Sequence, residues 1–231
     1  MQAERGSEER GRDLNREDWK KKLSGKLIVL DGPDGCGKTT QAKLLTQWLQ
    51  AQGVPTSNFR DPGDTTIGER IRDILLSPEH IAMSTRTEVL LYMAARAQLW
   101  QEEIAPALRE RECVVLDRWV SSTYAYQGCA GEFGTKVVRQ LASIALARVW
   151  ADLTIILDVD LETCEVRLPG KRDRMEAKPR QYHQKVREGF LQLANERDGF
   201  LVVDAAGDIE TVHERVKEEV VAFFESGDST D

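Results

Sequence analysis

Short apolar runs alternate along the chain with longer stretches in which apolar residues recur every three or four positions. The runs predict buried strands, because a strand covered on both faces needs apolar side chains at successive positions. The spaced pattern predicts helices with one apolar face. The expected strands are residues 27–30, 54–60, 113–116, 153–159 and 200–203, and the expected helices are residues 38–52, 67–76, 85–109 and 209–224.

This alternation predicts an α/β fold, a doubly wound parallel sheet with helices on both faces. Pro106 falls inside the longest expected helix and should break or kink it, because proline has no amide hydrogen to donate. Residues 167–180 are rich in Lys, Arg, Pro and Gly, and should form a mobile loop between two helical stretches. Residues 1–24 carry many charges and few apolar side chains, which favours a disordered extension ahead of one domain at residues 25–231.

Composition narrows the class of protein. The chain has 231 residues, 41% hydrophobic and 31% charged, which is ordinary for a folded domain. A formal net charge of −7 argues against non-specific binding of nucleic acid, which needs a basic surface. The four scattered cysteines form no CxxC pair, so a reducing compartment is expected. No apolar run approaches the length that spans a bilayer, so we expect no membrane partner and a cytoplasmic protein.

A phosphate-binding loop follows the first expected strand. The segment GPDGCGKT at residues 32–39 matches G-x-x-x-x-G-K-[ST] and leads into an expected helix. Backbone amides of such a loop wrap phosphates, and the helix N-terminus adds positive potential. Lys38 should bridge the β- and γ-phosphates, and the Thr39 hydroxyl should hold Mg²⁺. The predicted site for a nucleoside triphosphate comprises Gly32, Gly35, Cys36, Gly37, Lys38, Thr39 and Thr40.

The motif alone leaves GTPases, transport ATPases and small-molecule kinases open. An NKxD guanine motif is absent, which argues against a GTPase, and no Asp-Glu pair follows an apolar strand as in many ATPases. Instead, Asp117 and Arg118 follow the expected strand at residues 113–116. Such a pair can hold Mg²⁺ or its water through Asp117 and grip a second phosphate through Arg118.

Five further segments resemble one family. DRWVSSTYAYQG at residues 117–128 is similar to the "DRY–SS–AYQG" signature of thymidylate kinases, and RDPGDT at residues 60–65 to their "REPGGT" loop. LLYMAARAQ at residues 90–98, ADLT at 151–154 and DRME at 173–176 also have counterparts, in the same order. The resemblance covers the chain from about Gly25 to its end. It implies a P-loop nucleoside-monophosphate kinase fold, a homodimer, and phosphorylation of dTMP to dTDP by ATP with Mg²⁺.

The resemblance also implies roles for individual side chains. Tyr92 would stack on thymine, Arg96 would donate to its O4, and Gln127 and Ser122 would read its edge. Tyr126 would press on the sugar and disfavour a 2′-hydroxyl. Arg72 and Arg118 would clamp the 5′-phosphate, and Asp34 would orient the acceptor sugar or the metal. The dTMP site is therefore expected at Asp34, Arg60, Arg72, Tyr92, Arg96, Arg118, Ser122, Tyr126 and Gln127, and the metal at Thr39 and Asp117.

One member of the expected catalytic set is left open, namely the arginine that would stabilise the transition state. Gly35 follows Asp34, so the P-loop offers no arginine to the transition state, and the basic loop at residues 167–180 is the expected lid that supplies one. Arg172 is the first candidate, followed by Arg174 and Arg167; Lys38, Asp34 and Arg118 complete the expected catalytic set. The alternatives are another deoxynucleoside or nucleoside-monophosphate kinase, and a nucleotide-binding protein without catalysis.

Overall fold

Five parallel strands form one sheet at the centre of the molecule. The computed structural model describes residues 18–168, 170 and 172–226. The strands are β1 (Leu27–Asp31), β2 (Thr56–Arg60), β3 (Cys113–Asp117), β4 (Leu153–Asp158) and β5 (Phe200–Asp204), in the order β2-β3-β1-β4-β5. Since β1 pairs with both β3 and β4, the polar residues that follow these three strands meet at one edge of the sheet. The predicted α/β fold with a parallel sheet is confirmed.

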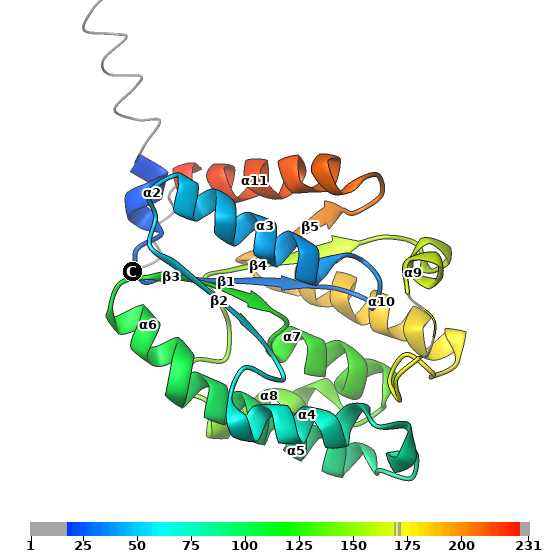
Figure 1. Ribbon diagram of the computed structural model, residues 1–231. Coiled ribbons are helices and arrows are strands. Elements are labelled where there is room, and N and C mark those ends of the chain that lie inside the picture. The colour runs from blue at the N-terminus through cyan, green and yellow to red at the C-terminus, as the bar shows by residue number, and fades with distance from the viewer. Residues whose placement is uncertain (1–17, 169, 171, 227–231) are drawn as a thin grey trace, which may run out of the picture.

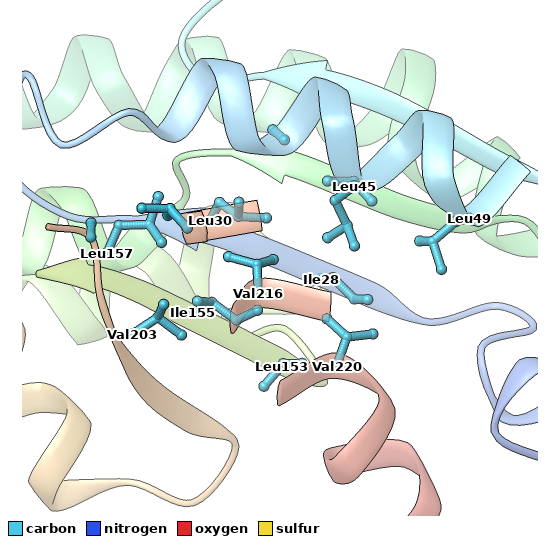
Figure 2. Close-up of a cluster of buried hydrophobic side chains, with 14 of the residues drawn as sticks. Ile28, Leu30, Leu45, Leu49, Leu153, Ile155, Leu157, Val203, Val216 and Val220 are labelled. Carbon is cyan, nitrogen blue, oxygen red and sulfur yellow. The ribbon is translucent and has the colours of Figure 1, made fainter. Parts of the chain in front are cut away.

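Helices cover both faces of this sheet (Figure 1). On one face lie α3 (Lys38–Ala51) and α11 (Ile209–Ser226), which enclose a core with β1 and β4 (Figure 2). On the other lie α5 (Thr85–Leu99), α6 (Ala105–Arg109) and α8 (Thr135–Ala145). The remaining elements are α2 (Asp18–Lys22), α4 (Thr66–Leu76), η1 (Pro78–His80), η2 (Trp100–Ile104), α7 (Val120–Thr123), η3 (Tyr124–Ala130), α9 (Leu161–Arg167) and α10 (Arg180–Glu196).

The expected long helix at residues 85–109 is interrupted as its proline predicts. The stretch Trp100–Ile104 is a π-helical turn, and the amide of Ala105 donates to the carbonyl of Trp100, five residues earlier. Pro106 comes next and has no amide to donate. The wider turn therefore accommodates the proline without ending the helix.

The N-terminal boundary differs from the expected one. Helix α2 lies within the segment expected to be an extension, yet Trp19 and Leu23 are buried in the core with α3 and α11. The Trp19 ring stacks on Trp48 of α3, with centroids 5.3 Å apart and planes 5° apart. The expectation that the domain begins near Gly25 was therefore wrong for residues 18–24, because two large apolar side chains outweigh the surrounding charges. Residues 1–17 of the expected extension lie outside the described residues.

Candidate active site

The phosphate-binding loop packs against the end of β4 and against α9. Gly32 has φ 139°, and a Cβ there would lie 2.5 Å from the carbonyl oxygen of Leu157. Gly35 has φ 83°, and a Cβ there would lie 2.4 Å from the carbonyl oxygen of Cys164. Both positions therefore need glycine, for the backbone conformation and for the close approach. The predicted loop is present and leads into α3 at Lys38.

Lys38 and Thr39 lie where the loop enters the helix. The Lys38 ammonium is buried and donates to the carbonyl of Pro33 at 2.6 Å, so its charge lies over the loop. The Thr39 hydroxyl donates to Asp117 Oδ2 at 2.5 Å. The other oxygen, Asp117 Oδ1, is buried without a hydrogen-bond partner among the described residues. A buried carboxylate oxygen normally has a partner. A hydroxyl and a carboxylate with a spare oxygen fit the preference of Mg²⁺ for oxygen ligands.

Asp34 and Arg118 form an ion pair at the centre of the site. Arg118 also donates to Gly32 O at 3.3 Å, and the Tyr126 hydroxyl donates to Asp34 Oδ2 at 2.7 Å. Burial raises the pKa of Asp34, but the charges of Arg118 and Lys38 outweigh it, so this pKa lies below its ordinary value. The carboxylate is therefore ionised at neutral pH and fixes the direction of the Arg118 guanidinium.

Asp31 holds the loop to the segment after β3, a role that was not predicted from the sequence. Its buried carboxylate accepts from Ser121 Oγ at 2.6 Å and from Ser122 Oγ at 2.7 Å, and it also accepts the amide of Gly32. Ser122 in turn accepts from Arg118 Nη1 at 3.0 Å. Since its single hydroxyl hydrogen goes to Asp31, Ser122 can act on a base only as an acceptor. The sequence feature that could have identified Asp31 is its position directly before Gly32, the first glycine of the motif.

A second positive group lies beside this pair. Arg72 of α4 donates to Pro62 O at 2.9 Å, and Arg60 pairs with Glu69 at 2.7 Å. Burial lowers the pKa of Arg72, and the charges of Arg60 and Arg118 lower it further. The guanidinium groups of Arg60, Arg72 and Arg118 are thus close enough to repel one another. A bound anion would stabilise this arrangement. Asp64, which the resemblance pairs with a glycine, adopts φ 56°, a left-handed conformation that Asp tolerates.

The expected base-reading residues lie on α5, η3 and, for Ser122, α7. Arg96 is buried and donates its Nε to Asp61 Oδ2 at 2.6 Å, and its Nη2 to Trp119 O at 3.2 Å. Within the described part of the chain, its Nη1 has only the weak acceptor Met93 Sδ as a hydrogen-bond partner, at 3.6 Å. Asp61 therefore orients Arg96 while one nitrogen retains donor capacity. The Asp61–Pro62 peptide bond is cis. Tyr92 lines the same cavity one turn away.

The three lid arginines are not brought together. Arg174 is buried, and it pairs with Glu88 at 2.5 Å and donates to Leu75 O at 2.7 Å. Arg174 is not among the residues that line the cavity at the phosphate-binding loop, so its place as a transition-state arginine stays a prediction that ranks behind Arg172 and Arg167. Arg167 lines the cavity but donates to Ala205 O and Gly207 O. Arg172 is exposed. Helices α9 and α10 flank the expected loop; residues 169 and 171 lie outside the described residues.

One cavity of about 960 Å³ joins these groups. Its lining includes the loop from Asp34 to Thr40, the Arg60–Pro62 turn, and side chains of α4, α5 and η3. The predicted residues that line it are Asp34, Gly35, Cys36, Gly37, Lys38, Thr39, Thr40, Arg60, Arg72, Tyr92, Arg96, Asp117, Arg118, Ser122, Tyr126, Gln127 and Arg167. A triphosphate at the loop and a second ligand near α5 would therefore share one space.

Two features are absent from the described part of the chain. No group of three or more His, Cys, Asp or Glu side chains is arranged to hold a metal ion. None of the helices is both long and apolar enough to cross a membrane.

Comparisons with known proteins agree on one family. The family model described as thymidylate kinase matches residues 30–216. A thymidylate kinase of Cutibacterium acnes is 43% identical over 206 residues, which cover 87% of this chain and 99% of the relative. One of Caldanaerobacter subterraneus subsp. tengcongensis is 39% identical over 204 residues, covering 87% and 98%. A crystal structure of thymidylate kinase from Ehrlichia chaffeensis has a TM-score of 0.69 at 29% identity, covering 84% of this chain and 97% of that one.

Proposed function

The chain belongs to the thymidylate kinase family, and we propose that it transfers the γ-phosphoryl group of ATP to dTMP, giving dTDP and ADP. The observation that carries this proposal is that one cavity contains both the phosphate-binding loop and a cluster of arginines, Arg60, Arg72 and Arg118. The ion pair of Asp34 with Arg118 links the loop to this cluster. Transfer of a phosphoryl group needs two anion-binding sites in line, one for the donor and one for the acceptor.

The donor site is the loop itself. The Gly32 amide already donates to Asp31 and Pro33 has none, so backbone amides from Gly35 onward would hold the ATP phosphates. Lys38 would neutralise charge on the transferred group. Thr39 and Asp117 would hold Mg²⁺, since the buried Asp117 Oδ1 has no other partner among the described residues. When bound, the ion supplies positive charge at the donor phosphates.

The acceptor site is the arginine cluster. Arg72 and Arg118, with Arg60 behind them, would bind the 5′-phosphate of dTMP and so relieve their mutual repulsion. Asp34 would fix Arg118 in this position through their ion pair. The reacting phosphate oxygen would then lie near the donor phosphate, which is the main contribution a protein makes to this reaction.

The base and sugar would contact α5 and η3. Tyr92 would stack on thymine, Arg96 would donate to O4 through Nη1, and Gln127 would bind the remaining edge. Tyr126 is fixed by its bond to Asp34 and would lie against the sugar, where a 2′-hydroxyl would be crowded. Residues 167–180 would close over the triphosphate and bring Arg172 to it, with Arg167 as the second candidate.

The rest of the molecule supports two coarser proposals. Apolar side chains are exposed on three neighbouring helices, namely Ile67 and Ile74 on α4, Leu90 on α5, and Val137 and Ile144 on α8. We infer that this face pairs two copies of the chain, because exposed apolar surface of this kind marks an interaction site. A dimer in sedimentation that Leu90→Lys disrupts would support the pairing. A cytoplasmic location fits four free cysteines.

An acceptor comparison tests the function. The protein is incubated with ATP, Mg²⁺ and one acceptor, and ADP release is followed for dTMP, dUMP, dCMP, UMP and thymidine. We expect dTMP to give the highest kcat/KM, and UMP to be strongly disfavoured because of Tyr126. Preference for thymidine would indicate a nucleoside kinase, and absence of ADP release with every acceptor would indicate a binding protein without catalysis.

A further inference from the structure

A buried polar chain connects the lid segment to the base-reading residue Gln127. Arg174 Nη1 lies 2.5 Å from Glu88 Oε2, and Gln127 Nε2 donates to Glu88 Oε1 at 2.7 Å. The three side chains are 5%, 4% and 1% exposed for Arg174, Glu88 and Gln127. They come from the turn after α9, the first turn of α5, and η3, so they join three parts of the fold.

Glu88 determines which way the Gln127 amide points. An amide can present either its oxygen or its NH₂ group to a neighbour, but an ionised carboxylate only accepts hydrogen bonds. The Gln127 NH₂ must therefore face Glu88, and its Oε1 is the end left for a ligand in the cavity that Gln127 lines. Arg174 neutralises the buried carboxylate, which would otherwise be costly at this depth.

We propose that Glu88, held by Arg174 of the lid segment, is a positioning residue that sets base specificity by presenting Gln127 as a hydrogen-bond acceptor. This inference rests on the proposed function. An acceptor at this position pairs with the N3–H of thymine. It opposes the lone pair of cytosine N3, which is itself an acceptor. Discrimination against cytosine is then shared between Gln127 and Arg96, which donates toward O4 and opposes the amino group of cytosine.

The contact between Arg174 and Glu88 also connects the orientation of the Gln127 amide to the lid segment. Arg174 reaches Glu88 from between α9 and α10, and it is tied to the end of α4 by donating to Leu75 O at 2.7 Å. Its backbone amide donates to Leu76 O at 3.1 Å. The segment that would cover the triphosphate is thus anchored beside the base pocket.

The test is Glu88→Gln, which keeps the shape but allows either orientation of the Gln127 amide. Values of kcat/KM are measured with dTMP and dCMP for the parent and the variant. We expect the dCMP-to-dTMP ratio to rise about tenfold, roughly the discrimination of one hydrogen bond. A merely structural role would lower both values together and leave the ratio unchanged. The matched control is Glu188→Gln, which alters an exposed pair in which Gln184 Nε2 donates to Glu188 at 2.9 Å.

A second variant keeps the test decisive if Glu88→Gln folds poorly with Arg174 unpaired. Glu88→Gln/Arg174→Met removes both charges and leaves the same freedom to the amide, so the same rise in the ratio is expected. A parent that phosphorylates dTMP, with a ratio that neither variant changes, would overturn this inference alone. A parent inactive on dTMP would overturn the proposed function and this inference with it.

Discussion

Replacing Arg72 by Met removes a guanidinium from the proposed phosphate clamp and keeps most of the apolar stem. In the structure this guanidinium lies near Arg60 and Arg118, and its pKa is lowered by burial and by those two charges. At neutral pH the group is charged in the folded and unfolded chain alike, so a lower pKa in the folded state means that its charge opposes folding. The substitution should therefore weaken catalysis without weakening the fold.

The two effects can be bounded from the contacts. Loss of a hydrogen bond to a charged group costs about 1.5–3 kcal/mol, which is roughly a 10- to 150-fold fall in kcat/KM for dTMP. On the stability side, the bond from Arg72 to Pro62 O is lost, at a cost of about 1 kcal/mol, while the repulsion from Arg60 and Arg118 is relieved. The melting temperature of the free protein should therefore stay within about 4 °C of the parent.

The assay combines initial rates with thermal melting in the presence and absence of dTMP. A ligand raises the melting temperature of the state it binds, so the shift produced by dTMP should shrink in Arg72→Met. Arg70→Met is the matched control, because Arg70 lies on the same helix but is exposed, and its pair with Asp73 at 3.9 Å is exposed too. An unchanged KM for dTMP, or a fall in rate fully explained by unfolding, would refute the role of Arg72.

Three further predictions concern other parts of the chain. Lys38→Ala should keep the fold and lose nearly all transfer, since few other cations can neutralise the moving phosphoryl group; near-normal turnover would remove Lys38 from the mechanism. Trp19→Ala should lower the free energy of unfolding by about 3–5 kcal/mol and the melting temperature by roughly 6–20 °C, whereas Lys21→Ala, in an exposed part of α2, should do neither. Arg172→Ala should lower kcat at least about a hundredfold with little change in the KM for dTMP; if it and Arg167→Ala both keep kcat within a few-fold, the stabilising cation lies elsewhere.

The central strands of the sheet were predictable because they are buried on both faces. The run Leu27–Asp31 and the run Cys113–Asp117 have no exposed position, so a continuous apolar stretch between turn residues identifies them. The stretch Val120–Ala130 gave no helical period for the related reason that nearly every residue in it is buried, polar ones included. A periodic pattern needs a solvent face, and this segment has none.

Local motifs identified the phosphate-binding loop, but they could not identify partners. Gly32 and Lys38 lie in one continuous segment, whose chemistry can be inferred from the order of its residues. The pairing of Arg174 with Glu88 joins positions 86 residues apart in the sequence, and no local spacing predicts it. Arg174 was for that reason grouped with the other lid arginines as a mobile cation. Only the fold distinguishes a basic residue that faces the triphosphate from one that neutralises a buried carboxylate.

The charges around Asp34 indicate how this site would accelerate transfer. Its pKa is lowered despite burial, because Arg118 and Lys38 outweigh the desolvation. A carboxylate that its neighbours stabilise as an anion is a weaker general base than a free one. None is needed, since a phosphate monoester is largely dianionic at neutral pH, with a second pKa of about 6. The acceptor oxygen is then already a nucleophile, and the remaining task is to hold two anions together. Asp34 would perform it indirectly, by holding Arg118 between them, so Asp34→Asn should lower kcat/KM by the same factor at pH 6.5 and pH 8.5. A loss that varied with pH across that range would assign proton transfer to Asp34 instead.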